Sequence, residues 1–191
     1  MSFLDLGIEP AIVYQLKKQG ITEPFEVQEA AIPDTLLGKD ICCRAPTGSG
    51  KTLAFGLPLI ARCKPSEPGR PSALIVTPTR ELAMQLFNEF SWLFSKKSIK
   101  MSTAIGGMDI KREKNNFSKG INLLIGTPGR LNDHLRRKSI ILNQLKSLVL
   151  DEADEMLDLG FKQDLEEIIK QTSKETRIMM FSATIPNKIE R

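Results

Sequence analysis

A glycine-rich segment around residue 50 has the residue types that bind phosphate groups. Residues 45–52 read Ala-Pro-Thr-Gly-Ser-Gly-Lys-Thr and follow a short run of strand-forming residues. Glycines allow a tight turn in which backbone amides point at phosphate oxygens, and a following helix adds the partial positive charge of its N-terminus. In such a loop Lys51 would reach the β- and γ-phosphates, and the Thr52 hydroxyl would ligate Mg²⁺.

The predicted phosphate-binding residues are Thr47, Gly48, Ser49, Gly50, Lys51 and Thr52. The strict pattern has glycine where this chain has Ala45. The alternative is a glycine- and serine-rich linker that contains a lysine by chance. The expected strand, loop and helix around the segment favour the phosphate site.

Two acids follow an apolar run later in the chain. Asp151 and Glu152 come directly after Leu148-Val149-Leu150. In a phosphate-binding protein, a carboxylate at the end of an apolar strand can hold Mg²⁺, and we assign this role to Asp151. Glu152 would be an uncommitted carboxylate that polarises the attacking water. Acids are common at helix starts, but together with residues 45–52 they predict a nucleoside triphosphatase with Lys51, Asp151 and Glu152 as catalytic residues.

These residues must be positioned by the elements that precede them. Apolar spacing predicts helices over residues 9–18, 26–37, 51–62, 80–94, 130–137 and 161–171. Strand-forming runs occupy residues 40–44, 73–77, 100–105, 122–126, 147–151 and 177–182. This alternation predicts a single α/β domain with a central, mostly parallel sheet and helices on both faces. The polar motifs follow strands directly, so they should converge on the carboxyl edge of the sheet.

Composition and charge narrow the class of protein. The chain has 191 residues, a net charge of +4 and 41% hydrophobic residues, as expected for one globular domain. Residues 96–138 are strongly basic and residues 151–167 strongly acidic, which suggests a surface for a polyanion beside a cation site. Two solvated helix faces would explain the charges equally well.

Other features of the chain exclude several classes. No membrane-spanning run, secretory signal or cysteine framework is visible, so we expect a monomeric intracellular protein of the cytoplasm. Residues 65–72 are predicted to form a mobile loop. We expect His134 at the surface, and we expect Cys42 and Cys43 to be buried in a strand. The aromatic residues at helical spacing should belong to the core, namely Phe87, Phe90, Trp92 and Phe94.

Taken in order, the motifs resemble the first RecA-like domain of a DEAD-box ATP-dependent RNA helicase, from Phe3 to Thr184. Residues 20–28 resemble the adenine-reading Q motif, within an N-terminal segment spanning residues 1–38. The resemblance implies that the Gln28 amide reads adenine and that Phe3, at the spacing of the upstream aromatic, stacks on the base. Residues 25–27 read Phe-Glu-Val where the family has Thr-Pro-Ile.

Three further segments resemble the motifs of this family that contact RNA, at residues 78–83, 106–107 and 127–130. The resemblance implies contacts from Thr79, Arg80, Gly107, Thr127 and Arg130 to the sugar-phosphate backbone of single-stranded RNA, largely independent of base sequence. Each tripeptide alone could be an ordinary turn; residues 127–130, for example, could cap a helix.

Residues 182–184 resemble the coupling motif of the family, in which Ser182 and Thr184 would hydrogen-bond the acidic segment at Asp154. An ordinary turn at a strand end is the alternative.

The resemblance implies ATP or ADP and Mg²⁺ as ligands, RNA as a partner, and a second RecA-like domain that this chain lacks. Without the arginine finger of that domain, worth roughly 10³–10⁵ in kcat, the chain alone should hydrolyse ATP very slowly. The full-length parent would couple ATP hydrolysis to local unwinding of RNA. Two alternatives remain open: an RNA clamp with negligible turnover, and a DNA translocase, which a requirement for the 2′-hydroxyl would exclude.

Overall fold

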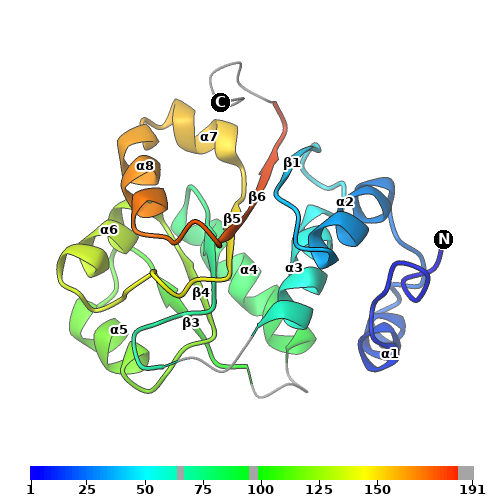
Figure 1. The fold of residues 1–191 in the computed structure, drawn as a ribbon, viewed down its shortest axis with the longest axis horizontal. Helices are drawn as coiled ribbons and strands as arrows, with labels where there is room; N and C mark the ends of the chain where they lie inside the picture. Colours follow the sequence, from blue (N-terminus) through cyan, green and yellow to red (C-terminus); the bar gives the residue numbers. More distant parts are fainter. Residues whose placement is uncertain (64–66, 95–98, 185–191) are drawn as a thin grey trace.

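The computed structural model describes residues 1–63, 67–94 and 99–184. Six strands form one parallel sheet in the order β1-β6-β5-β2-β4-β3 (Figure 1). The strands are β1 (Ile41–Arg44), β2 (Ala73–Val76), β3 (Met101–Ala104), β4 (Leu123–Gly126), β5 (Ser147–Leu150) and β6 (Arg177–Ser182). Because every pair is parallel and in register, the polar segments that follow the strands share one edge of the sheet.

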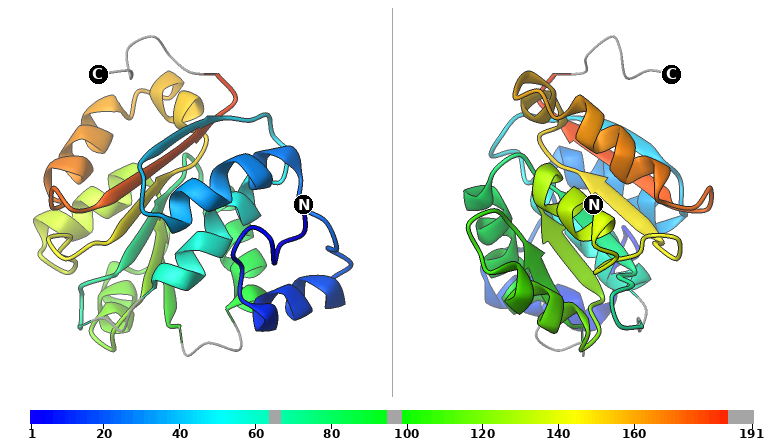
Figure 2. Two further views of the ribbon diagram at one scale, coloured as in Figure 1. Left: turned by 45° about the vertical axis from the view of Figure 1, so that its right-hand side comes forward. Right: turned by 90° about the vertical axis from the view of Figure 1, so that its left-hand side faces the viewer.

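Helices cover both faces of the sheet (Figure 2). One face is covered by α1 (Pro10–Lys18), α2 (Glu26–Leu36), α3 (Lys51–Arg62) and α4 (Arg80–Leu93). The other face is covered by α5 (Ile110–Phe117), α6 (Pro128–Arg136), α7 (Ala153–Asp158) and α8 (Lys162–Lys170). The prediction of a parallel α/β sheet with helices on both faces is therefore confirmed.

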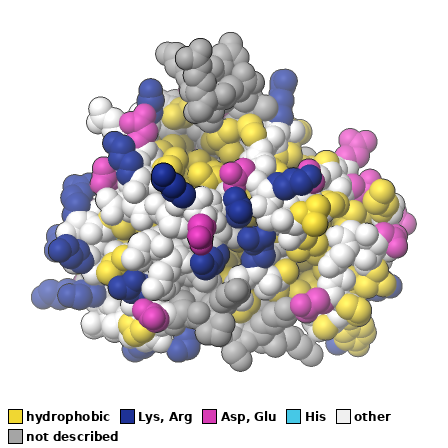
Figure 3. Space-filling model, in the orientation of Figure 1, with side chains coloured by type: hydrophobic (Ala, Val, Ile, Leu, Met, Phe, Trp, Pro, Cys, Tyr) yellow, Lys and Arg dark blue, Asp and Glu magenta, His cyan; other side chains and the backbone are white. Residues whose placement is uncertain are grey.

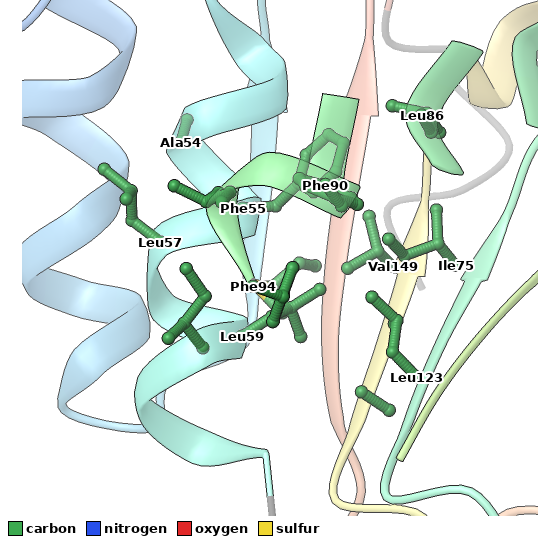
Figure 4. Packing of buried hydrophobic residues seen from close by; sticks show 14 of the residues in the cluster. Ala54, Phe55, Leu57, Leu59, Ile75, Leu86, Phe90, Phe94, Leu123 and Val149 are labelled. Carbon is green, nitrogen blue, oxygen red and sulfur yellow. The ribbon is translucent and has the colours of Figure 1, made fainter. Parts of the chain in front are cut away.

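Successive residues of the central strands point to opposite faces, so each strand contributes to two separate cores. In β2, Ile75 joins the core under α1 to α4, whereas Leu74 and Val76 join the core under α5 to α8. In the first core, Phe55 of α3 packs edge-on against Phe90 of α4, with ring centres 6.0 Å apart (Figure 4). This packing fixes α3, and with it the glycine-rich loop that precedes α3.

Most expected elements are present, with two additional helices. All six predicted strands form. Helix α5 was not expected because Ile110 and Phe117 are its only apolar residues, too few to show helical spacing. Helix α7 has only six residues and is too short for the same analysis. Of the predicted 65–72 loop, residues 67–72 form a turn and a bend, and residues 65 and 66 lie outside the described residues.

Two predictions about side-chain burial are wrong. Cys42 is exposed and Cys43 only half-buried, because β1 is an edge strand that leaves one face open to solvent. His134 is completely buried rather than at the surface, since α6 turns it inward onto Glu113 and the Phe117 ring. Phe90 and Phe94 are in the core as predicted, with Phe87 and Trp92 partly buried against it.

Within the described residues, no helix combines the length and apolar character needed to cross a bilayer.

Candidate nucleotide and nucleic-acid site

A cavity of about 550 Å³ lies at the carboxyl edge of the sheet, over the half formed by β1, β6 and β5. Its wall includes the glycine-rich loop, the segment around Gln28, one side of α4, and the acidic pair after β5. The cavity thus collects most of the residues predicted to bind a nucleotide. Among those lining it are Gln28, Thr47, Gly48, Gly50, Lys51, Thr52, Asp151 and Glu152.

The glycine-rich loop has a backbone that only glycine adopts readily. Gly48 and Gly50 have φ angles of 81° and 87°, in the left-handed region. A side chain at Gly50 would also lie 2.5 Å from the Phe25 ring and 2.6 Å from the Gln28 amide nitrogen. The buried Ser49 hydroxyl has no partner among the described residues, and α3 begins immediately after the loop. A cradle of this shape with an unpartnered hydroxyl fits a phosphate group.

Lys51 and Glu152 form a buried ion pair beside this loop. Lys51 Nζ lies 2.9 Å from Glu152 Oε1, and their side chains are 7% and 13% exposed. The same oxygen accepts a hydrogen bond from the Thr47 hydroxyl at 3.2 Å. Glu152 was expected to be uncommitted, and this expectation is wrong in this structure, where Glu152 is paired with Lys51. The reason is electrostatic, because a buried ammonium is stable only beside an opposite charge.

Glu152 is held in an unusual backbone conformation. Its φ of 50° lies in the left-handed region, which costs a residue with a side chain about 1–3 kcal/mol. Glu152 is the residue immediately before α7, and only Asp151 separates it from the end of β5. The sharp change of direction aims its carboxylate back at the glycine-rich loop.

The neighbouring Asp151 is almost completely buried. The pKa of Asp151 is raised to about 6, and burial is the largest cause. The Lys51 ammonium offsets part of this increase, and the Glu152 carboxylate adds to it. Asp151 Oδ1 also accepts a hydrogen bond from the Glu152 amide at 3.1 Å. A buried carboxylate with an elevated pKa in a cavity is typical of a functional site.

Gln28 connects the N-terminal segment to the glycine-rich loop. Its side-chain oxygen accepts a hydrogen bond from the Phe25 amide at 3.0 Å, and its nitrogen donates to the Gly50 carbonyl at 2.9 Å. The residue is 2% exposed but lines the cavity. One amide proton and one lone pair of the side chain are left for a ligand.

The other half of the carboxyl edge, formed by β2, β4 and β3, carries the three segments predicted to contact RNA. Thr79 caps α4 by accepting a hydrogen bond from Leu82 N, and Thr127 precedes the first turn of α6. The Arg80 guanidinium donates to the Gly106 carbonyl at 3.3 Å. Arg130 donates to the Met108 carbonyl at 2.9 Å. The segments therefore form one connected surface, although both arginines bond to a protein loop here.

Basic side chains gather on the same side of the molecule as this half. Lys and Arg gather on the left of Figure 3, where α5 and α6 lie in Figure 1. Of the predicted basic band, Lys96 and Lys97 lie outside the described residues.

The segment after β6 is tied to the acidic segment after β5. The Ser182 hydroxyl accepts a hydrogen bond from the Asp154 amide at 3.1 Å, and Asp154 Oδ2 accepts bonds from the Thr184 amide and hydroxyl at 2.9 Å each. The predicted hydrogen bonds to Asp154 are thus confirmed. Although burial would raise the pKa of Asp154, the hydrogen bonds from Ser182 and Thr184 outweigh it and lower the pKa below its usual value.

The family model for DEAD/DEAH box helicases matches residues 25–191, which is most of the chain. The chain belongs to the DEAD/DEAH box helicase family. Among its relatives, an ATP-dependent RNA helicase CshA of Limosilactobacillus reuteri is 43% identical over 191 residues, and a DEAD-box ATP-dependent RNA helicase RhpA of Helicobacter pylori is 43% identical over 190 residues. The chain is covered completely in both comparisons but spans only 38% of each of those proteins.

The fold of this DEAD/DEAH box helicase chain also matches a solved structure. A DEAD box protein from the hyperthermophile Methanococcus jannaschii superposes with a TM-score of 0.92 at 38% identity. The match covers 99% of this chain and 52% of that one.

One residue predicted from the helicase resemblance lies elsewhere. Phe3 is fully buried in the core under α1 to α4 and is not part of the cavity wall, so its ring has no face available to a base. The aromatic side chain that lines the cavity is Phe25, which is 60% exposed. Sequence spacing favoured Phe3 because an isolated aromatic gives no indication of which way its ring points.

Sequence analysis of this helicase chain also missed Glu89 on α4. Glu89 lines the cavity, and its Oε2 is buried with no hydrogen-bond partner among the described residues. Burial raises the pKa of Glu89, whereas a hydrogen bond with Thr52 lowers it. Its position on the cavity side of α4 follows from the core spacing of Leu86 and Phe90, but nothing in the sequence separates it from an ordinary helix-surface glutamate.

Proposed function

We propose that this chain is the ATP- and RNA-binding RecA-like domain of an ATP-dependent RNA helicase. The proposal treats residues 1–191 as one helicase domain that includes the N-terminal segment 1–38. The observation that carries it is the cavity in which Lys51 and Thr52 face Asp151 and Glu152. Membership of the DEAD/DEAH box helicase family and the printed names of the relatives support the same function.

In the nucleotide half, Lys51 would exchange Glu152 for the β- and γ-phosphates of ATP. Amides of the glycine-rich loop would bind the same phosphates, and the Gln28 amide would bind the adenine edge. Glu152, released from Lys51, would then orient the attacking water. The proposed nucleotide-binding residues are Gln28, Thr47, Gly48, Ser49, Gly50, Lys51 and Thr52, and Lys51, Asp151 and Glu152 are the proposed catalytic residues.

The cavity also fits Mg²⁺. Among the described residues no group of three or more histidine, cysteine or acidic side chains could hold a metal ion by itself. An ion that takes most of its ligands from phosphates and water needs no such group, and Thr52 with the buried Asp151 would supply the protein side. Bound there, Mg²⁺ would neutralise charge on the β- and γ-phosphates.

In the other half, we propose that Thr79, Arg80, Gly107, Thr127 and Arg130 form a track for the sugar-phosphate backbone of RNA. Hydroxyls, amides and guanidinium groups bind this backbone without reading bases. The surrounding basic side chains would attract it at long range. A second RecA-like domain is the expected partner within a longer chain. The two halves would be coupled to it through Asp154, Ser182 and Thr184. The domain alone should therefore hydrolyse ATP slowly.

The decisive experiment measures steady-state ATP hydrolysis by the full-length protein with no nucleic acid, with single-stranded RNA, and with DNA of matched sequence. Glu152→Gln serves as the blank. Stimulation by RNA alone is the expected result. Equal stimulation by DNA would favour a translocase, and hydrolysis under no condition would favour a clamp.

A further inference from the structure

Glu113 is a buried acid that lies within the basic stretch of residues 96–138. It lies on α5, is 4% exposed, and belongs to none of the motifs that the proposed function uses. One oxygen, Oε1, accepts a hydrogen bond from the Ile105 amide at 3.0 Å. The other, Oε2, lies 2.7 Å from His134 Nε2 and 3.6 Å from an Arg130 nitrogen. A carboxylate with this many partners fixes the groups around it.

The groups that Glu113 fixes belong to the loop after β3, residues 105–108. One guanidinium nitrogen of Arg130 forms the ion pair with Glu113, and another donates a hydrogen bond to the Met108 carbonyl. Arg130 therefore holds the end of the loop in place. Arg80 braces the middle through the Gly106 carbonyl. Gly107 turns there with a φ of 83°, and a Cβ at Gly107 would lie 2.5 Å from Arg80 Nη1. The loop is therefore held at its start, middle and end.

His134 also contacts the Glu113 carboxylate. It is fully buried, stacks edge-on against Phe117 with ring centres 4.8 Å apart, and has no partner for Nδ1 among the described residues. A neutral imidazole that carries its proton on Nε2 donates to Glu113 and leaves only a lone pair unsatisfied. In that form the histidine orients the carboxylate and leaves its charge for Arg130.

We propose that Glu113 is a positioning residue for RNA binding: it holds the 105–108 loop and Arg130 in the arrangement that accepts the sugar-phosphate backbone. This inference rests on the proposed function, since it takes the 105–108 loop as part of the RNA track. It assigns Arg130 the role of a brace for that loop.

The positioning role of Glu113 and simple electrostatics predict opposite changes in RNA affinity when the Glu113 charge is removed. Removing an acid from a basic surface should strengthen the binding of a polyanion, because repulsion is lost. If Glu113 positions the loop, removing its charge should weaken binding instead. Asp133 offers a matched control, because it lies on α6 in the same basic region, its side chain is 51% exposed, and its carboxylate forms a 4.0 Å ion pair with the exposed Arg136.

The test uses this chain at low salt and a short fluorescein-labelled oligouridylate, with binding followed by anisotropy. Glu113→Gln keeps an acceptor for the Ile105 amide and should weaken RNA binding by roughly fivefold. Arg130→Lys keeps the positive charge but loses the two-sided brace, and should weaken it similarly. Asp133→Asn should leave RNA binding unchanged or tighter. ADP affinity, measured on each variant, should not change, because Glu113, Arg130 and Asp133 are not among the residues that line the nucleotide cavity.

The double variant Glu113→Gln/Arg130→Lys should lose no more affinity than the weaker-binding single variant, since both act through one loop. Tighter RNA binding by Glu113→Gln, or a parallel loss of ADP affinity, would overturn the inference. The first result would make the charge a simple repulsion, and the second would make Glu113 a general support of the fold. Failure of the unsubstituted chain to bind RNA would overturn the proposed function and this inference with it.

Discussion

Lys51 Nζ lies 2.9 Å from Glu152 Oε1, so the ammonium proposed to bind phosphate holds the carboxylate proposed to orient water. The two groups are 101 residues apart in the sequence, one after β1 and the other after β5. Glu152 is not free to orient water while the pair is intact. We therefore expect a bound nucleotide to replace the carboxylate with a phosphate at Lys51, which would free Glu152 only when the nucleotide is present.

Glu152→Gln should bind ADP more tightly than the unsubstituted chain, by roughly threefold to tenfold, while abolishing ATP hydrolysis in the full-length protein. The amide no longer competes with phosphate for Lys51 and removes a negative charge from the cavity. Titration calorimetry with ADP measures the first effect and steady-state turnover the second. Weaker ADP binding would show that the ion pair assists the loop rather than competing with phosphate.

Lys51→Ala should lower ADP affinity by about 100-fold or more, because the cavity loses its buried cation and retains acidic side chains that include Asp151 and Glu152. The matched control is Lys39→Ala, which removes an exposed lysine whose only ion pair, within the described residues, is with Asp34 at the surface. The control should bind ADP as before. Unchanged ADP affinity in Lys51→Ala would remove the glycine-rich loop from the nucleotide site.

The sequence predicted the sheet well, and most of the residues it assigned to a nucleotide line one cavity, because both depend on local patterns. Apolar runs such as residues 73–76 are continuous only in strands covered on both faces, and the loop before Lys51 is contiguous in sequence. The errors concern contacts made across the fold. The orientation of Phe3 and the burial of His134 depend on which helix packs beside them, and apolar spacing within one element does not contain that information.

Gln28→Ala should weaken ADP binding and reduce the preference for ADP over GDP. The change removes the amide that would face adenine and also the bonds to Phe25 and Gly50 that fix the cavity wall. Competition with a fluorescent ADP analogue measures both nucleotides.

Phe3→Leu is the informative control for Gln28→Ala. Phe3 is buried away from the cavity, so this variant should lose about 1 kcal/mol of stability and keep the ADP preference. A changed ratio of ADP to GDP affinity in Phe3→Leu would restore Phe3 as a base-contacting residue.

Thr184→Val should reduce stability at neutral pH by no more than about 1 kcal/mol, because it removes one hydrogen bond to a partly exposed carboxylate. The Asp154 pKa is lowered in the folded chain, so the stabilisation from its charge is present above the ordinary aspartate pKa. It is lost as the pH falls through the lowered value. Urea unfolding of both proteins across the acid range should show their stabilities converging at low pH. Parallel curves would mean that Thr184 does not act through the charge of Asp154.

Glu89→Gln should reduce the effect of Mg²⁺ on ADP binding by roughly threefold or more, measured as the ratio of ADP dissociation constants in EDTA and in Mg²⁺. The hydrogen bond between Glu89 and Thr52 would engage the Thr52 proton and leave lone pairs of the hydroxyl oxygen for a cation. The buried Oε2 adds negative charge where a cation is expected. Glu166→Gln, which removes a largely exposed glutamate on α8, is the matched control and should show the full effect of Mg²⁺. An equal response to Mg²⁺ in both variants would mean that Glu89 takes no part in cation binding.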